Sequence, residues 1–371
     1  MVPGVARVRP EADGLLRHLQ ARIAAAGPIG IDAYMEAALF DPRWGYYATR
    51  DPFGARGDFV TAPDVSQVFG ELIGLWLADL WRRMGAPDPV ILAELGPGRG
   101  TLLSDALRAT RVVPGFGHAA RLHLVERSPV LRHAQAGTLG GAAPQWHDEL
   151  STLPPGPLLL VANEFLDALP IRQFVRHADG WHERRVGLAP EGGLAFKIDA
   201  VPATDHGIAA ALADASPGSI AETRAPAAAL ARRIAARLAA SAGAALFIDY
   251  GHAASACGDT LQAVRRHRPH DVLADPGTAD LTAHVDFAAF AAAAEGAQVW
   301  GPVTQGAFLR GLGIAARTDA LCARATPDQA RLLLTGTQRL VDPTAMGRMF
   351  KVLALTGKDT PEPAGFATEE R

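Results

Sequence analysis

Three glycines at alternating positions form the clearest chemical pattern in the chain. Gly96, Gly98 and Gly100 follow the apolar run 90–95, and a helix is predicted to begin near Thr101. Glycine permits a tight turn and a close approach of the backbone to a ligand, and the first N–H groups of a helix can donate to the same ligand. Glycine-rich turns also occur for packing alone, so the neighbouring residues decide what the loop does.

The acidic residue before this loop separates two kinds of ligand. A dinucleotide fingerprint requires a glycine where this chain has Thr101, and Glu94 would repel a pyrophosphate. S-adenosylmethionine (AdoMet) carries no phosphate but has a sulfonium and an ammonium group, so charge favours this cofactor. The residues expected to bind AdoMet here are Glu94, Gly96, Pro97, Gly98, Gly100 and Thr101.

Glu126 closes the next apolar run and is a candidate partner for the ribose hydroxyls. It stands 30 residues after Gly96, whereas a dinucleotide motif places its acid about 20 residues on. By itself Glu126 could be a surface acid. Together with the glycine loop it is predicted to be a cofactor ligand.

These residues need a frame, and four apolar runs supply it. Residues 90–95, 122–125, 158–162 and 245–248 each end at a polar or acidic residue, as buried parallel strands of a βαβ sheet do. Ligands bind such sheets at the carboxyl ends of the strands. The sequence therefore predicts an α/β fold, a doubly wound Rossmann-like sheet. Its ligand edge collects Glu94, Glu126, Asn163, Glu164 and Asp249.

The remaining patterns divide the chain into five segments. Helical spacing dominates the N-terminal part, with helices expected to stop at Gly27 and before Asp41, and alternating runs at 172–175, 181–186 and 194–198 predict an extra hairpin. The expected segments are a helical N-terminal lid region (1–85), the first half of the AdoMet-binding core (86–165), an inserted hairpin and helix substrate region (166–240), the second half of the core sheet (241–357) and a loose tail (358–371).

Composition excludes several classes of protein. The net charge of -3 argues against a nucleic-acid partner. No apolar stretch reaches eighteen residues, so no membrane insertion is expected, and residues 1–10 lack the apolar core of a secretory signal, which favours the cytoplasm. Cys257 and Cys322 have neither disulfide nor zinc-site spacing, so no metal site is expected.

Five segments in the same order resemble the MidA family. They are GDFVTAPDVSQVFGELIGLWLA (57–78), LAELGPGRGTL (92–102), ANEFLDALP (162–170), LFIDYG (246–251) and DPGTADLTAHVDF (275–287), and the resemblance covers roughly residues 28–357. The family comprises class I AdoMet-dependent methyltransferases associated with assembly of respiratory complex I, and its mitochondrial members are protein arginine methyltransferases. Asp64 replaces the usual glutamate with its charge kept, and Leu166 replaces a common phenylalanine at a possible substrate wall.

The resemblance implies a protein-arginine N-methyltransferase that acts on a complex I subunit or a similar protein, in the mitochondrial matrix if the host is eukaryotic. A guanidinium substrate presents a planar fork of donors, which carboxylates orient and deprotonate. Glu164 and Asp167 are the catalytic candidates, and Asn163 is a candidate cofactor ligand. Alternatively, Asn163 and Glu164 cap a following helix or bind the methionine part of AdoMet.

Other polar residues in these segments have weaker assignments. Asp58, Thr61 and Gln67 resemble the family's lid over AdoMet, although Gly57 and Asp58 could form a plain turn. Tyr250 and His284 could line a substrate pocket or pack in the core. The basic run 265–270 could be a solvated loop or a docking site for an acidic partner.

Two other functions stay open at this point. A non-catalytic assembly factor could bind AdoMet structurally, and an NAD(P)-linked oxidoreductase could use the glycine loop. The missing dinucleotide glycine at Thr101 and the charge of Glu94 count against the second.

Overall fold

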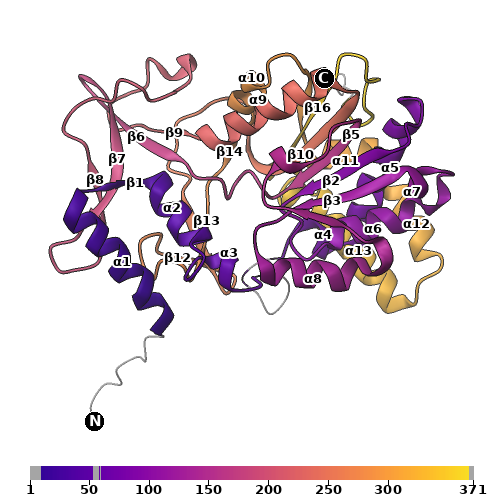
Figure 1. The fold of residues 1–371 in the computed structure, drawn as a ribbon, viewed down its shortest axis with the longest axis horizontal. Coiled ribbons are helices and arrows are strands. Elements are labelled where there is room, and N and C mark those ends of the chain that lie inside the picture. Colours follow the sequence, from indigo (N-terminus) through magenta and orange to yellow (C-terminus); the bar gives the residue numbers. More distant parts are fainter. Residues whose placement is uncertain (1–9, 53–57, 59, 367–371) are drawn as a thin grey trace, which may run out of the picture. The chain divides into compact units, whose positions relative to one another are not determined.

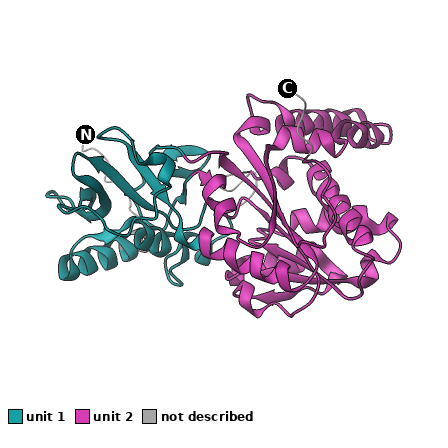
Figure 2. Cartoon of the chain, turned by 90° about the horizontal axis from the view of Figure 1, so that it is seen from above, with its two compact units in different colours: residues 1–59, 168–226, 256–283 teal, residues 60–167, 227–255, 284–371 magenta. Residues whose placement is uncertain are grey.

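The structure, a computed structural model, describes residues 10–52, 58 and 60–366 (Figure 1). The chain forms two compact units, each assembled from three separated stretches (Figure 2). Unit 1 comprises residues 1–59, 168–226 and 256–283, and unit 2 comprises residues 60–167, 227–255 and 284–371. The expectations for residues 1–9, Gly57 and residues 367–371 lie outside the described residues.

An eight-stranded sheet is the frame of unit 2. Seven strands run in the order β15-β16-β10-β5-β2-β3-β4, and β14 pairs with β10. The strands are β2 (Val90–Leu95), β3 (Ala120–Val125), β4 (Gln145–His147), β5 (Leu158–Asn163), β10 (Gly243–His252), β14 (Val285–Asp286), β15 (Gln298–Thr304) and β16 (Phe350–Thr356). Every pair is parallel except those of β16, which runs antiparallel to β10 and β15. The four predicted parallel strands are confirmed as β2, β3, β5 and β10.

The order of the strands reverses between β2 and β5. From β2 the chain proceeds outward through β3 to β4, and it then returns to β5 and continues to β10 on the other side. Leu95 of β2 lies beside Ala162 of β5, so the carboxyl ends of these two strands are neighbours. A doubly wound sheet binds its ligands at such a reversal, and the predicted doubly wound fold is confirmed.

Helices bury the faces of this sheet. Residues 62–83 form two helices, α4 (Ala62–Val65) and α5 (Gln67–Arg83). They are separated at Ser66, which caps α5 through a hydrogen bond from the Val68 N–H. α5 joins the same core cluster as β2 and β5, with Phe69 and Leu77 fully buried. The other helices are α6 (Thr101–Ala109), α7 (Phe116–Ala119), α8 (Pro129–Leu139), α9 (Ala225–Ala240), α10 (Phe287–Ala293), α11 (Gln305–Gly311), α12 (Ile314–Cys322), α13 (Pro327–Val341) and α14 (Met346–Met349).

The described part of the C-terminal tail packs on unit 2, where a loose segment was expected. The Thr360 hydroxyl lies 3.0 Å from the Gly243 carbonyl and donates to it, and the Trp76 indole donates to the Ala364 carbonyl at 3.0 Å. Phe366 is buried against Phe308. The burial of Phe366 and these two hydrogen bonds to backbone carbonyls hold residues 358–366 in place.

Unit 1 has a smaller sheet covered by the N-terminal helices. Its five strands run β1-β7-β6-β9, with β8 on β7, and the predicted hairpin is confirmed in β6, β7 and β8. The elements are α1 (Pro10–Ala26), β1 (Ile29–Gly30), α2 (Ile31–Phe40), α3 (Tyr46–Thr49), β6 (Arg172–His177), β7 (Gly180–Leu188), β8 (Leu194–Ile198) and β9 (Ile220–Thr223). α1 buries Leu15, Leu19 and Ile23, as its spacing predicts.

A second sheet of unit 1 was not anticipated. β11 (Gln262–Arg265), β12 (Arg268–His270) and β13 (Asp280–Thr282) pair in the order β12-β11-β13. The basic run 265–270 therefore forms a hairpin, in which Arg266 and His267 have φ values of 52° and 60°. A two-residue hairpin turn requires such positive φ angles.

The two units do not follow the five consecutive segments expected from the sequence. α1 and α2 belong to the core of unit 1, whereas α5 belongs to the core of unit 2, so the segment 1–85 is divided near residue 60. The inserted hairpin shares unit 1 with α1 and α2. Each of these helices thus belongs to the unit whose core buries its apolar face. In the part of the chain that the structure describes, we find no helix with the length and apolar character needed to cross a bilayer.

Candidate active site

The glycine loop makes a tight turn between β2 and α6. Gly96, Gly98 and Gly100 have φ values of 59°, 53° and 82°, all in the left-handed region. A Cβ atom on Gly96 would lie 2.7 Å from the ring of Phe165, so a side chain there would displace that ring. The tight turn predicted from the glycine spacing is confirmed, and α6 begins at Thr101 as expected.

Glu94 is a buried acid at the end of β2. Its side chain is 3% exposed, and among the described residues its Oε2 atom has no hydrogen-bond partner. Burial raises the pKa of Glu94 to about 8. A carboxylate buried in this way is costly unless a cation or a donor faces it. Glu94 therefore fits a positively charged ligand at the turn.

Glu126 follows β3 and is tied to the glycine loop through Gln135. Its Oε1 accepts the Ser128 N–H at 2.8 Å, and its Oε2 accepts the Gln135 amide at 3.3 Å. The same Gln135 amide nitrogen donates to the Gly98 carbonyl at 2.8 Å. Burial raises the pKa of Glu126, and the hydrogen bonds from Ser128 and Gln135 oppose that rise. Glu126 is thus held beside the loop.

Gln135 was missed in the sequence, although a signal exists. It is fully buried on α8 between Leu131 and Leu139, and its Oε1 accepts the Trp146 indole N–H at 2.8 Å. A polar residue on the buried stripe of a helix needs polar partners inside the protein. That placement marks Gln135 as the residue that connects Glu126 with the glycine loop.

The residues after β5 form a polar turn next to that loop. Glu164 has a φ of 50°, and its Oε1 accepts the Ala62 N–H at 3.0 Å and the Asn163 amide at 3.1 Å. Burial raises the pKa of Glu164 to about 7. The hydrogen bond from the Ala62 N–H opposes this rise, and the nearby Asp167 adds a smaller rise. No helix begins directly after Asn163, so the helix-capping alternative does not describe this turn. Asn163 Oδ1 is buried without a partner among the described residues.

Asp249, which follows the stretch of β10 that pairs with β5, fixes this turn. Its Oδ2 accepts three consecutive N–H groups, from Phe165, Leu166 and Asp167, at 3.1, 2.9 and 3.2 Å. Three charge-assisted hydrogen bonds to one oxygen leave the turn little freedom. Asp249 was placed at the ligand edge by the sequence, but its hold on residues 165–167 follows only from the fold. Asp167 is 6% exposed and lies in the held turn.

The segment before α5 is tied to both sides of the site. Asp64 accepts the hydroxyls of Thr61 at 3.1 Å and Thr101 at 3.4 Å. Together with the bond from Ala62 to Glu164, these contacts place residues 61–64 next to the start of α6 and the turn after β5. Of the predicted lid residues, Thr61 therefore lies beside the glycine loop.

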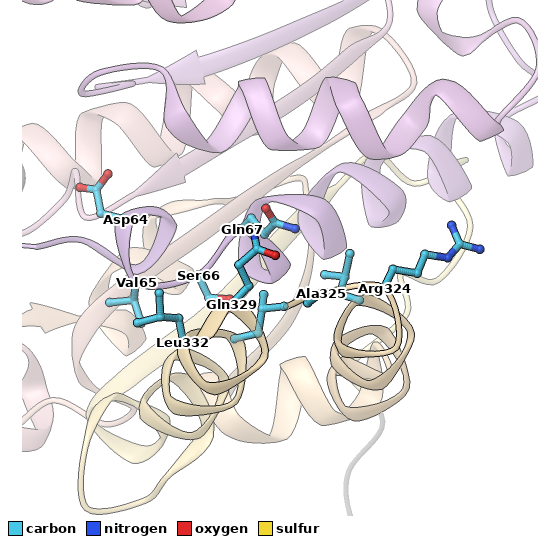
Figure 3. A pocket seen from close by; sticks show the side chains of 10 residues that line it. Asp64, Val65, Ser66, Gln67, Arg324, Ala325, Gln329 and Leu332 are labelled. Atoms are coloured by element: carbon cyan, nitrogen blue, oxygen red, sulfur yellow. The ribbon is translucent and has the colours of Figure 1, made fainter. Parts of the chain in front are cut away.

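The other two predicted lid residues have contacts of their own. Asp58 belongs to unit 1, where it accepts the Tyr46 hydroxyl at 2.8 Å and the Arg266 N–H at 2.7 Å. Gln67 begins α5 and lines a pocket in unit 2 (Figure 3). The lining comprises Asp64, Val65, Ser66, Gln67, Leu321, Arg324, Ala325, Gln329, Leu332 and Leu333. Gln67 thus faces α12 and α13.

Tyr250 and His284 contact each other at the end of β10. Their rings meet edge to face, with centroids 5.5 Å apart, and Tyr250 also packs on Phe350 at 5.6 Å. These aromatic contacts give both residues a packing role in unit 2.

The sequence matches one protein family over most of the chain. The family described as "Putative S-adenosyl-L-methionine-dependent methyltransferase" covers residues 72–303. Similar curated proteins are the mitochondrial protein arginine methyltransferase NDUFAF7 of Danio rerio, 38% identical over 92% of this chain and 86% of the relative, and its homologue in Drosophila melanogaster, 37% identical over 92% and 84%.

A solved structure matches the whole chain. It is a crystal structure from Burkholderia thailandensis bound to S-adenosyl-homocysteine, 32% identical to this chain, with a TM-score of 0.84. The match covers 100% of this chain and 98% of the other. The residues matched by the family therefore lie within the stretch covered by the structural match.

Proposed function

Since the chain belongs to this family of S-adenosyl-L-methionine-dependent methyltransferases, we propose that it methylates arginine side chains of a protein, at the turn after β5. Membership of the family identifies AdoMet as the methyl donor, but it does not identify the group that accepts the methyl. The names of the relatives, which are protein arginine methyltransferases, support a guanidinium acceptor. The partly buried carboxylate of Glu164, with its raised pKa, is the observation that carries the proposal.

The residues around the glycine loop fit AdoMet. Glu94 offers a buried carboxylate oxygen with no partner among the described residues, which suits the positive charge of the cofactor. Glu126, held by Gln135, offers acceptors for ribose hydroxyls. We assign Glu94, Gly96, Pro97, Gly98, Gly100, Thr101, Glu126 and Asn163 to cofactor binding, with Thr61 in the covering segment. When bound, AdoMet supplies a methyl carbon made electrophilic by its sulfonium.

Glu164 orients the acceptor and takes up a proton. Ala62 and Asn163 fix its Oε1, so the carboxylate points in one direction. As the nitrogen–carbon bond forms and the sulfur–carbon bond breaks, the guanidinium gives up one N–H proton. A carboxylate with a pKa of about 7 is suited to accept that proton near neutral pH. Asp167, in the turn fixed by Asp249, adds negative charge that attracts a guanidinium.

The proposed partner and compartment rest on similarity to the relatives. The relatives named above are mitochondrial protein arginine methyltransferases, which supports a protein substrate. The resemblance to the MidA family supports a subunit of respiratory complex I or a similar protein as that substrate. The proposed compartment is the mitochondrial matrix in a eukaryotic host and the cytoplasm otherwise. The oxidoreductase alternative is set aside, because family membership and the charge of Glu94 both favour AdoMet.

A single substitution tests the acceptor site. Glu164→Gln should bind AdoMet with unchanged affinity, measured by calorimetry, and lose about 100-fold or more in methyl transfer to lysate proteins of a deletion strain. Glu149→Gln, which changes an exposed carboxylate of the same unit, is the matched control. Labelled methylarginine in the hydrolysed product is expected. Full turnover of Glu164→Gln would refute the assignment, and AdoMet binding without any transfer by the native chain would favour a non-catalytic assembly factor.

A further inference from the structure

Three metal-ligating side chains meet at the turn between β6 and β7 in unit 1. His177 ends β6, Asp179 lies in the turn, and His182 is on β7. One ligand atom of each lies within 4.8 Å of the other two. His182 Nε2 is 3.0 Å from Asp179 Oδ1, and the ring centroids of His177 and His182 are 4.4 Å apart. Among the described residues, this is the group of three that could hold a metal ion.

The hairpin itself places these residues on one face. His177 pairs with Gly180 and Val175 pairs with His182, so the two histidines are diagonal neighbours. Side chains alternate between the faces of a strand, which places Arg176 on the opposite face. Its guanidinium lies over the Trp181 ring at 5.7 Å. The adjacent positive charge is therefore directed away from the cluster.

His182 has a fixed orientation. It is 4% exposed, and its Nδ1 lies 2.7 Å from the Asp199 carbonyl. A carbonyl only accepts, so Nδ1 carries a hydrogen and donates it. In the neutral ring the Nε2 lone pair then faces the carboxylate of Asp179. Two acceptors 3.0 Å apart require a cation between them, either a proton or a metal ion. A backbone carbonyl that holds the second nitrogen is also the usual support of a metal-bound histidine.

We propose that this turn binds a divalent transition metal ion, Zn²⁺, through His177, Asp179 and His182. Zinc bonds to histidine nitrogen and carboxylate oxygen are about 2.0–2.2 Å long, so the ligand atoms must come to about 3.3 Å from one another in a tetrahedral site. His177 and Asp179 are exposed and can rotate to reach this geometry, whereas His182 is already held. The fourth position is left for water, as in zinc sites with three protein ligands.

This site shares no residue with the proposed methyl-transfer site. Neither Glu164 nor any residue assigned to AdoMet binding is a ligand here, and all three ligands belong to unit 1. No metal site was expected from the sequence, because Cys257 and Cys322 lack the spacing of a zinc site. The spacing His-x-Asp-x-x-His brings three ligands together only when a two-residue turn folds the strands back on each other. A bound ion would close the end of the hairpin and stabilise unit 1.

Zinc titration of the full chain tests the proposal. The protein is stripped of metal, its purification tag is removed, and Zn²⁺ is titrated in competition with a chromogenic chelator. One equivalent is expected to bind, with affinity at least tenfold lower in His177→Ala and in Asp179→Asn. His118→Ala is the matched control, because His118 is an exposed histidine 3.7 Å from a single carboxylate, that of Asp88. This variant should bind zinc as the native chain does.

Thermal unfolding supplies a second readout. Zn²⁺ should raise the melting temperature of the native chain and of His118→Ala, but not that of His177→Ala. The exposed position of His177 lets this variant fold, which circular dichroism checks. Equal zinc affinity in all variants, or no bound equivalent in the native chain, would overturn the proposal. In the second case a proton alone lies between His182 and Asp179.

Discussion

Two buried glutamates on strands of the two units have opposite surroundings. Glu183 on β7 of unit 1 is 5% exposed and bonds to Arg172 at 2.9 Å and to Arg185 at 2.8 Å. Burial raises its pKa, but the two guanidinium groups outweigh burial and the net pKa is lowered. Glu94 on β2 of unit 2 is 3% exposed, has no partner for Oε2 among the described residues, and has a pKa raised to about 8.

The difference separates a structural acid from one reserved for a ligand. The charge of Glu183 is neutralised within the protein, so it stabilises the fold. The carboxyl group of Glu94 lies at the reversal of the large sheet, beside three glycines with positive φ, where ligands of doubly wound folds bind. Burial of Glu94 costs folding energy, which a cationic cofactor would recover in the proposed site. The following predictions test this contrast.

Removal of the charge of Glu94 should have the largest effect. Glu94→Gln keeps the shape of the side chain and is expected to weaken AdoMet binding by about 100-fold, roughly 2.7 kcal/mol, since a buried charge would lose its partner. Calorimetric titration measures the affinity. Glu183→Gln is the control, and AdoMet should bind it as tightly as the native chain. Equal affinities for Glu94→Gln and the native chain would refute the contrast.

The same substitution at Glu183 should instead affect stability. Glu183→Gln leaves Arg172 and Arg185 without their shared carboxylate, and the free energy of unfolding should fall by about 2 kcal/mol. This is below the cost of breaking a fully buried pair, because each arginine side chain is about a third exposed. Denaturation of the cofactor-free protein in urea measures the loss. A loss of the same size in Glu94→Gln would contradict the account.

The pH dependence of stability should differ in sign between the two acids. The folded pKa of Glu94 lies above its usual value of 4.5, so the folded state keeps a proton that the unfolded state has lost. The free energy of unfolding therefore falls as pH rises from about 4.5 to about 8, by up to about 1.4 kcal/mol per pH unit. Glu94→Gln should reduce this slope in urea denaturation curves of the cofactor-free protein. Glu164, whose pKa is raised to about 7, contributes a slope of the same sign below pH 7.

The lowered pKa of Glu183 gives the opposite trend. Its contribution to stability is present above its unfolded pKa and is lost as pH falls through its folded pKa. Glu183→Gln should therefore change stability at neutral pH and have little effect in strong acid. An unreduced slope between pH 4.5 and 8 in Glu94→Gln would contradict the assignment of that slope to Glu94.

Gln135 should have a smaller effect on the cofactor site. Gln135→Leu removes the hydrogen bonds to Gly98 and Glu126. The carboxylates of Glu94 and Glu126 both remain. AdoMet affinity is expected to fall about tenfold while kcat stays near the native value, because a supporting residue acts by positioning. Titration and steady-state kinetics measure the two quantities. Gln338→Leu, at an exposed position of α13, is the control and should leave both unchanged. A loss of kcat alone would contradict this role.

The sequence predicted the parts of the site that depend on local backbone. Alternating glycines require positive φ angles, and apolar runs closed by acids fix the ends of β2, β3 and β5. The loop, its helix and the position of Glu126 could therefore be predicted. These features need only the spacing of residues along the chain.

The remainder depends on contacts between distant segments. The bonds from Asp249 to residues 165–167 and from Ala62 to Glu164 span about 80 and 100 positions. The three-stranded sheet of unit 1 and the metal-ligand cluster at β6 and β7 likewise arise from pairing of strands. No local periodicity carries such information, and the division of residues 1–85 between two units depends on which core each helix joins.

A crystal structure with AdoMet bound to the native chain tests the central claim most directly. We expect the cofactor at the turn between β2 and α6, with its ammonium or sulfonium group facing the Glu94 carboxylate and its ribose at Glu126. A cofactor bound elsewhere, or one whose positive groups face away from Glu94, would contradict the account.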